Sequence, residues 1–400
     1  MLRAEAAQMR RTHEERLLQT LREQGPLSRG ELETRTGLTR RAIADLTAEM
    51  LARRTIVSVP AASGESRGRG RPASLFALAP DAGRFVGVDF GHRRVLVAAV
   101  SPTNEILAQE TRTYPEDASW TRRVETAIEL MEALESVDLG AVEGIGVGMS
   151  GPVGASAVAL SASWAGAATK HAVDLVTSSL GERYGAPVVV DNNDRYAALA
   201  EVVWGSARDV DSLLYVRSSH GVGGGLVIGG EPVVGSHGMA GEIGHVSVPG
   251  ADERCWCGKR GCLETVISTE ALVRAARRHD PSIDGIADIA AAAERPEIAS
   301  IIDTATEALA GALATVTIVM DPREVIVGGD IAKLGAPFFR SLTERFERLL
   351  MPVRDALPRP RAAALGDDAG ALGAIADAFR RVPVAGAAPT TSTTTSEARA

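Results

Sequence analysis

The stretch VVVDNNDRYAALAE, residues 188–201, decides the fold of this chain. Its three β-branched valines predict a short buried strand of a parallel sheet, and the alanine-rich run from Ala197 predicts a helix. Four polar side chains, Asp191 to Asp194, lie between them. Because α/β folds hold ligands at the carboxyl ends of parallel strands, this turn is predicted to be a catalytic centre or a binding site.

One pattern occurs twice, on either side of this stretch. RFVGVDFGHRRVLVAAV (84–100) has the pattern of a strand, a tight turn and a strand, and SLLYVRSSHGVGGGLVIGGEPVVG (212–235) repeats it. One glycine-rich hairpin is a weak indication, since such turns are common. Two at matching positions predict an α/β fold of two lobes with a cleft between them.

The composition indicates a packed protein without a membrane segment. Hydrophobic residues make up 45% of the 400 residues, enough for two or three domains with cores of their own. A run of about 18 apolar residues is absent, and the N-terminus MLRAEAAQMRRTHEER is too charged for a signal peptide. We therefore expect a cytoplasmic protein with no membrane partner.

The first 80 residues differ in charge from the rest of the chain. They hold 14 arginines and nine acidic residues, a net charge of about +5, whereas the whole chain carries −8. A basic N-terminal region on an acidic body indicates that this region alone meets a polyanion. Ordinary variation of surface charge is the alternative.

Residues 1–81 have the pattern of a winged helix-turn-helix domain. Helices are expected over 16–25, 29–37 and 40–54, with N-caps at Ser28 and Thr39 and a turn at Gly37. Strands over 55–60 and 74–80 would form the wing, with a flexible arginine-rich tip between them that is either a DNA contact or a solvated loop. Such domains contact DNA with the start of the third helix and the wing, so the predicted contacts are Ser28, Arg29, Thr39, Arg40, Arg41, Ala42, Arg67, Arg69 and Arg71.

The cysteines form a local cluster. Cys255, Cys257 and Cys262 are the only three in the chain, and His245 lies ten residues before the first. Three thiolates and an imidazole suit a tetrahedral Zn²⁺ ion, and four protein ligands would close the site and make it structural. Free buried cysteines are the alternative.

The most specific segment of the body is GMAGEIGHVSVPGADERCWCGKRGCLE, residues 238–264, followed by MDPREVIVGGD (320–330) and LGDDAGALGAIADAF (365–379). These segments resemble the ROK family (repressors, open reading frames and kinases), in the sugar-kinase branch of the actin-like superfamily. The resemblance implies a two-lobed, RNase H-like α/β fold over 82–383, with a zinc loop at 245–262. The Ala/Thr-rich composition of residues 384–400 predicts a disordered tail. A winged N-terminal domain on this body is the layout of the family's repressors.

The same resemblance implies a sugar site. In the family the zinc loop shapes the sugar pocket, so that His245 would bond the metal through one nitrogen and meet a sugar hydroxyl with the other. Paired carboxylates and amides suit vicinal hydroxyls because each offers a planar fork. Ion pairs within the zinc loop are the alternative role for the two glutamates. The implied sugar contacts are Asn192, Asn193, Glu242, His245 and Glu264.

The chemistry of the family's kinases is predicted to be absent. Those kinases have Glu-Asn-Asp at the end of this strand, with the Asp as the base, where this chain has Asp191, Asn192 and Asn193. An amide cannot accept the hydroxyl proton. Their first phosphate loop, Asp-x-Gly-Gly-Thr-Lys, is matched here by a turn with the bulky His92 and Arg93, and Ser219-His220 replaces Gly-Thr before the second. We expect no catalytic residue.

The sequence thus predicts a zinc-containing, sugar-responsive transcriptional regulator, a repressor, acting as a homodimer or homotetramer on operator DNA. Two alternatives stay open. The chain is an ATP-dependent hexose or N-acetylhexosamine kinase that also binds DNA, or it is a regulator controlled by a partner protein, with a vestigial sugar cleft.

Overall fold

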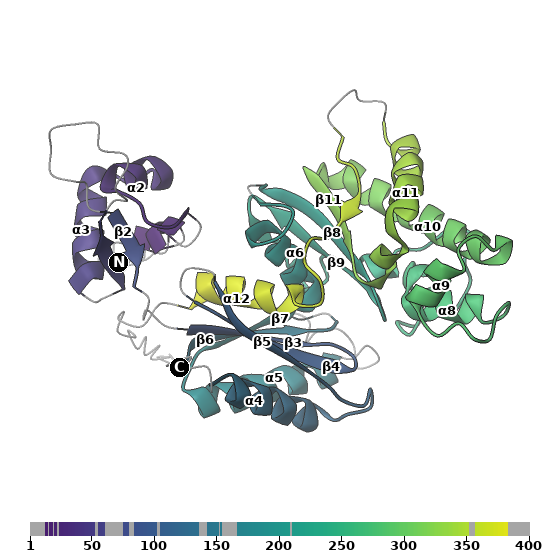
Figure 1. Cartoon of the computed structure of the whole chain (residues 1–400), viewed down its shortest axis with the longest axis horizontal. Helices are drawn as coiled ribbons and strands as arrows, with labels where there is room; N and C mark the ends of the chain where they lie inside the picture. The colour runs from purple at the N-terminus through teal and green to yellow at the C-terminus, as the bar shows by residue number, and fades with distance from the viewer. Residues whose placement is uncertain are drawn as a thin grey trace, which may run out of the picture.

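The computed structural model describes residues 13–14, 16–18, 20–21, 24–52, 55–60, 75–79, 84–101, 105–135, 142–151, 153, 166–208, 210–351 and 357–382. They form a small N-terminal domain and a larger body of two lobes, each built on a sheet (Figure 1). The predicted boundary at residues 81 and 82 and the tail at 384–400 lie outside the described residues.

The N-terminal domain has the predicted order of helix, glycine turn, helix and hairpin. Helix α2 (Arg29–Thr36) begins with a capping box, in which the Ser28 hydroxyl accepts from the Glu31 amide at 3.3 Å and the Glu31 carboxylate accepts from the Ser28 amide at 2.8 Å. It ends at Gly37, whose φ of 66° is left-handed and favours glycine. Helix α3 (Arg40–Ala52) and the antiparallel strands β1 (Ile56–Val59) and β2 (Leu75–Leu78) follow.

The core of this domain is made by one face of each helix. The leucines of the predicted first helix, Leu17, Leu18 and Leu21, are buried with Ile43 and Met50 of α3. Apolar side chains at helical spacing thus account for the packing of the domain, as the sequence pattern predicts.

The first lobe contains a sheet in the order β5-β4-β3-β6-β7. Its strands are β3 (Arg84–Phe90), β4 (Arg94–Val100), β5 (Ile106–Thr113), β6 (Val142–Met149) and β7 (Val188–Asn192). Strands β3, β4 and β5 are antiparallel neighbours, and β6 and β7 extend the sheet in parallel with β3. Helices α4 (Trp120–Glu135) and α5 (Gly166–Tyr184) cover its outer face (Figure 1).

The second lobe repeats this sheet, in the order β10-β9-β8-β11-β12. The strands are β8 (Ser212–Ser218), β9 (Val222–Ile228), β10 (Glu231–Pro232), β11 (Glu324–Gly328) and β12 (Arg361–Ala362). Again three strands are antiparallel and two extend the sheet in parallel. The outer helices are α7 (Glu264–Ile267), α8 (Thr269–Ala276), α9 (Ile286–Ala291), α10 (Pro296–Met320) and α11 (Gly335–Leu349). The predicted two-lobed α/β fold is confirmed.

Helix α10 is, within the described part of the chain, long and apolar enough to cross a membrane by length and composition. Half of that segment is buried, and Ile298, Leu309 and Leu313 pack in the core of the second lobe. Packing against α11 and the sheet accounts for its apolar character as a core helix.

Helices α6 (Asn193–Val203) and α12 (Ala369–Arg381) pack against each other between the two sheets (Figure 1). Helix α12 lies on β3 and β6 of the first lobe, and α6 lies on β8 and β9 of the second. Buried side chains of both helices and both sheets form one continuous core. This helix pair therefore joins the lobes and places the start of α6 between them.

Close approach along α12 requires glycine at defined places. A Cβ added to Gly146 of β6 would lie 2.0 Å from the carbonyl oxygen of Ala374, and one added to Gly373 would lie 1.7 Å from the carbonyl oxygen of Tyr196. A hydrogen bond of 2.9 Å from the Tyr196 hydroxyl to Asp377 secures the same contact. The helix pair thus tolerates no larger residue at Gly373.

Substitution of Gly373 by alanine is expected to lower the free energy of unfolding by about 3 kcal/mol, because the added methyl group overlaps the backbone of α6. Gly311 of α10 is the matched control, since a Cβ there meets no atom within 4 Å. Gly311→Ala should raise stability by up to about 1 kcal/mol through helix propensity. Thermal unfolding of both variants measures this, and equal midpoints would contradict the packing described here.

Candidate functional site

The polar stretch after the three valines contains no separate turn, which corrects the expectation of one. Strand β7 continues through Asp191 and Asn192, and α6 begins directly at Asn193. The Asn192 side-chain oxygen caps this helix by accepting from the backbone amides of Asp194 at 2.8 Å and Arg195 at 3.1 Å. Its amide donates to the carbonyl of Gly151 at 2.9 Å, so one amide hydrogen of Asn192 remains for a ligand.

Asn193 lies at the centre of the site. It is buried, and its side-chain amide donates to the carboxylate of Asp89 at 3.1 Å. Its side-chain oxygen is buried without a hydrogen-bond partner among the described residues. A buried acceptor left unpaired costs about 1–3 kcal/mol. A ligand hydroxyl that donates to this oxygen would recover that free energy.

The carboxylates on both sides of Asn193 are held by arginines. Asp191 forms a buried ion pair with Arg195, and Asp194 forms an ion pair of 2.5 Å with Arg217 of β8. Asp89 is also buried, and burial raises its pKa, against the opposing effect of Arg217 and of the Asn193 amide. The two carboxylates closest to Asn193 in sequence are therefore already paired with arginines of the protein.

Arg195 connects three parts of the site and was not predicted from the sequence, where it is one charged residue in an alanine-rich helix. Its fully buried guanidinium donates to the carbonyls of Val153 at 2.8 Å, Gly238 at 3.1 Å and Ala240 at 3.2 Å, besides its ion pair with Asp191. The start of α6 is thus bonded to the segment that leads into Glu242.

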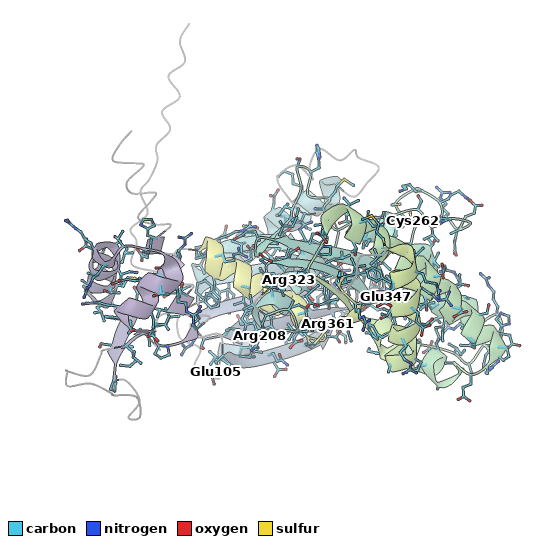
Figure 2. The ribbon with its side chains drawn as sticks, turned by 90° about the horizontal axis from the view of Figure 1, so that it is seen from above. Glu105, Arg208, Cys262, Arg323, Glu347 and Arg361 are labelled. Atoms are coloured by element: carbon cyan, nitrogen blue, oxygen red, sulfur yellow. The ribbon has the colours of Figure 1, made fainter. Side chains whose placement is uncertain are left out.

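The four predicted metal ligands lie together in the second lobe. Their ligand atoms, from His245, Cys255, Cys257 and Cys262, all lie within 4.8 Å of one another. Sγ of Cys255 is 3.6 Å from Nδ1 of His245, and Sγ of Cys257 is 3.6 Å from Sγ of Cys262. Figure 2 shows Cys262 in this lobe, at the end of the molecule away from the N-terminal domain. The cluster has the donor set and the spacing to hold a metal ion.

Without a bound cation, the thiols of this cluster do not ionise readily. Burial raises the pKa of Cys255 to about 12 and also raises the pKa of Cys262. A metal ion would reverse this, since a coordinating thiol is deprotonated. The residues therefore fit a thiolate-bound metal.

The predicted sugar-binding glutamates lie on both sides of the cluster. Nε2 of His245, the ring nitrogen that faces away from Cys255, is 3.9 Å from the Glu242 carboxylate. Burial, and next the neighbouring Asp194, raises the pKa of Glu242 to about 7. Glu264 accepts from the backbone amide of Val222 at 3.0 Å and from the indole of Trp256, so it ties the cysteine loop to β9.

The glycines of GVGGG (221–225) allow close packing between a strand and a helix. Residues 222–228 form strand β9, and only 219–221 form the hairpin turn. A Cβ on Gly223 would lie 1.8 Å from the Asp194 carboxylate, and one on Gly225 would lie 2.5 Å from Cβ of Ala198. These glycines let β9 pack directly on α6.

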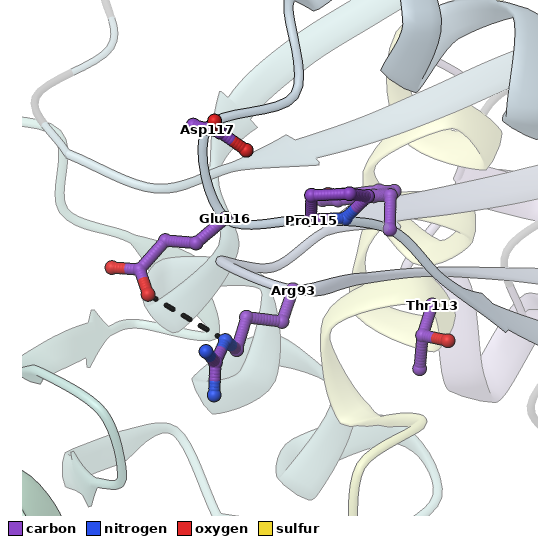
Figure 3. Close-up of a pocket in the computed structure, with 6 residues that line it drawn as sticks. Arg93, Thr113, Pro115, Glu116 and Asp117 are labelled. Atoms are coloured by element: carbon purple, nitrogen blue, oxygen red, sulfur yellow. Dashed lines mark ion pairs between the residues drawn. The ribbon is translucent and has the colours of Figure 1, made fainter.

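The two hairpin turns, one from each lobe, meet each other. His92 of the β3–β4 turn and His220 of the β8–β9 turn have ring centroids 4.1 Å apart. Beside them is an open hollow of about 770 Å³ lined by Arg93, Glu116 and their neighbours, shown in Figure 3. None of the predicted sugar contacts lines this hollow.

The predicted DNA contacts in the N-terminal domain differ in how exposed their side chains are. The side chains of Arg40 and Arg41 are 91% and 92% exposed at the start of α3. Thr39 caps α3 by accepting from the Ala42 amide at 3.3 Å, and the exposed Arg29 lies over the Phe76 ring. Ser28 and Ala42 are half-buried. Arg67, Arg69 and Arg71 lie outside the described residues, so the wing tip stays a prediction.

Two hairpin-led sheets around a central helix pair, with a polar cluster at the start of α6, define a protein of the actin-like sugar-kinase class. The model of the ROK family matches residues 85–380, and the chain belongs to the ROK family.

Relatives of both kinds, kinase and regulator, resemble the chain. It is 29% identical over 313 residues to a glucokinase of Halalkalibacterium halodurans, which spans 72% of this chain and 93% of the relative. It is 29% identical to a putative xylose repressor of Caldicellulosiruptor sp. over 64% of each protein. A crystal structure of a ROK family transcriptional regulator, a homologue of the E. coli MLC protein, superposes with a TM-score of 0.76 and 24% identity, over 93% of this chain and 97% of the other.

Replacement of Arg195 by methionine is expected to lower the free energy of unfolding by about 3–5 kcal/mol, because Asp191 is left buried and unpaired. Arg122 is the matched control, since its ion pairs with Glu125 and Glu129 are exposed. Arg122→Met should cost less than about 1 kcal/mol. Denaturant unfolding of both variants measures the difference, and an equally small loss for Arg195→Met would show that this arginine does not hold the site together.

Proposed function

We propose that the chain is a sugar-responsive, DNA-binding transcriptional regulator of the ROK family, a cytoplasmic repressor that binds its sugar without phosphorylating it. The observation that carries this proposal is Asn193. By the resemblance to the ROK family, Asn193 stands where the family's kinases have a proton acceptor, and its buried side-chain oxygen has no hydrogen-bond partner among the described residues. Such a group can accept a hydrogen bond from a sugar hydroxyl but cannot take its proton.

The surroundings of Asn193 support the loss of phosphoryl transfer. Asp191 and Asp194, the two carboxylates that a shift of one residue would recruit, are each engaged by an arginine. Loss of a general base typically costs about 10²–10⁴ in rate. The turn at His92 adds a second obstacle, because bulky side chains stand where backbone amides would approach a phosphate.

The metal cluster is proposed to hold one structural Zn²⁺ ion. His245, Cys255, Cys257 and Cys262 would supply four ligands and leave no open position, which suits a structural and not a catalytic ion. The ion would fix His245 with Nε2 toward Glu242 and would hold the loop that Glu264 ties to β9. Zinc would therefore shape the sugar site without contacting the sugar.

The sugar is proposed to bind where the start of α6 meets the zinc loop, between the lobes. Its hydroxyls would contact Asn193, Glu242 and His245, with Asn192 and Glu264 at the edge because most of their polar atoms already have protein partners. Sugar binding can alter DNA affinity only if the two conformations of the protein bind the sugar unequally. Movement of one lobe against the other about the α6–α12 pair would provide those conformations.

The DNA would be an operator with two half-sites. Arg29, Thr39, Arg40 and Arg41 are exposed on one domain, which is the requirement for contact with base edges and phosphates. Ser28 and Ala42 would position the helices that carry them, and Arg67, Arg69 and Arg71 would follow the backbone or the minor groove. Because paired domains of this kind contact sites about 34–36 Å apart, we propose a homodimer or a homotetramer.

The second candidate is an ATP-dependent hexose or N-acetylhexosamine kinase that also binds DNA. The glucokinase that matches over 93% of its own length favours it, as does Glu242, whose pKa near 7 suits a general base. The two candidates differ in one measurable outcome: only the kinase phosphorylates its sugar. If neither turnover nor sugar binding occurs, regulation by a partner protein is the remaining interpretation.

The purified protein is expected to shift a fragment of its own upstream DNA, with an affinity that falls steeply as salt rises. Arg40→Ala combined with Arg41→Ala should weaken binding by at least about tenfold and reduce the salt dependence. Arg278→Ala, an exposed arginine of the second lobe, is the control and should bind as the wild type does. Binding that ignores salt and both arginines would contradict a DNA-binding N-terminal domain.

Titration calorimetry over pentoses, hexoses and N-acetylhexosamines is expected to identify one sugar that binds at pH 8. Glu242→Gln should weaken that sugar by about 10- to 100-fold, since a hydrogen bond to a charged group contributes about 1.5–3 kcal/mol. Glu270→Gln, at an exposed carboxylate on α8, should leave the affinity unchanged. Equal affinities for all three proteins would place the sugar elsewhere.

A further inference from the structure

A second group of metal-ligand side chains lies outside the sugar and cysteine sites. Atoms of His92, Glu116 and His220 that can bind a metal all lie within 4.8 Å of one another. Nε2 of His220 is 3.5 Å from the Glu116 carboxylate. We propose that these three residues form a second metal site, which binds one divalent transition-metal ion such as Zn²⁺ between the two lobes.

The donor set selects the class of metal. Two imidazoles and a carboxylate, with an open position, are the ligands of zinc sites that keep a solvent molecule, and of other first-row ions. Mg²⁺ prefers oxygen ligands and would bind poorly. Bonds of about 2.0–2.2 Å to Zn²⁺ place ligand atoms roughly 3.3 Å apart, so a small contraction of the observed spacing completes the site. Both His220 and Glu116 are accessible, with side chains 40% and 50% exposed.

The backbone around two of the ligands is already fixed. The guanidinium of Arg123 donates to the carbonyls of Gly91 at 3.4 Å, Glu116 at 2.7 Å and Ala118 at 3.0 Å, and the Tyr114 hydroxyl donates to the Gly91 carbonyl at 2.6 Å. The turn with His92 and the segment with Glu116 are therefore bonded to each other. Little ordering entropy would be lost when they bind a metal together.

The third ligand comes from the other lobe on an equally fixed turn. Next to His220, the Ser219 hydroxyl accepts from the Asp330 amide at 3.1 Å, and the Ser219 carbonyl accepts from the Thr269 amide at 2.8 Å. A metal bound by His92, Glu116 and His220 would thus join rigid parts of both lobes. It would favour the arrangement of the lobes in which the two hairpins meet.

One neighbouring cation competes for Glu116. Arg93 is 3.5 Å from the Glu116 carboxylate, in the ion pair drawn in Figure 3, and its side chain is 72% exposed. A metal ion would replace this weak surface pair. Removal of Arg93 should therefore strengthen metal binding, whereas removal of a ligand should weaken it.

The test is a titration with Co²⁺ of full-length protein that carries one equivalent of Zn²⁺, enough for the cysteine cluster alone, followed by calorimetry and visible absorption. One further equivalent is expected, with d–d bands but without the sulfur-to-cobalt charge transfer that the cysteine cluster would give. His92→Asn and His220→Asn should each weaken it by more than about 100-fold, because even outer partners of metal ligands contribute 10- to 100-fold. Arg93→Ala should bind more tightly, and Mg²⁺ should not compete.

His279→Asn, at an exposed histidine of the second lobe, is the matched control and should bind Co²⁺ as the wild type does. Circular dichroism of each variant checks that it is folded, and Glu116→Gln gives a third, independent loss of binding. No further equivalent, or one that persists in both His92→Asn and His220→Asn, would overturn the proposal. The outcome is independent of whether the chain binds DNA or a sugar.

Discussion

The contact on which the structure depends is the packing of α12 on α6 between the two sheets. It brings the backbone at Gly373 against the carbonyl of Tyr196, three residues after Asn193, with no room for a larger residue. Because α6 also packs on the glycines of β9, elements of both lobes contact this one helix. The start of that helix is also where the polar cluster lies. We propose that a small rotation of one lobe would change the geometry around Asn193, as a sugar-controlled regulator requires.

At the start of α6, the neighbouring carboxylates each have a partner within the described part of the protein. Arg195 neutralises Asp191, Arg217 neutralises Asp194, and the Asn193 amide is bonded to Asp89. A carboxylate at position 193 would lie against Asp89, and repulsion between the two would oppose its ionisation. The Asn193 amide avoids this repulsion and donates a hydrogen bond to Asp89 instead.

Much of this could be predicted from the sequence. The three valines, the two hairpins and the Ser28 capping box each follow from local chemistry, and the structure contains all of them. Cys255, Cys257 and Cys262 are close in sequence, so their clustering with His245 was also predictable. The pairing of His92 with Glu116 and His220 was not, because it depends on where two lobes meet. Nor was Arg195, whose partners lie up to 45 residues away in the chain. The packing role of the β9 glycines was not predictable either, because tight helix packing and phosphate binding favour the same residue type.

The most direct test of the central claim is transfer of the γ-phosphate of radiolabelled ATP to a panel of sugars in the presence of Mg²⁺, with a ROK family glucokinase as the positive control. No labelled sugar phosphate should form, and Asn193→Asp alone should restore little, because His92 and Arg93 still obstruct the phosphate turn. Sugar phosphorylation by the wild-type protein that disappears in Glu242→Ala would contradict the account and make this chain an enzyme.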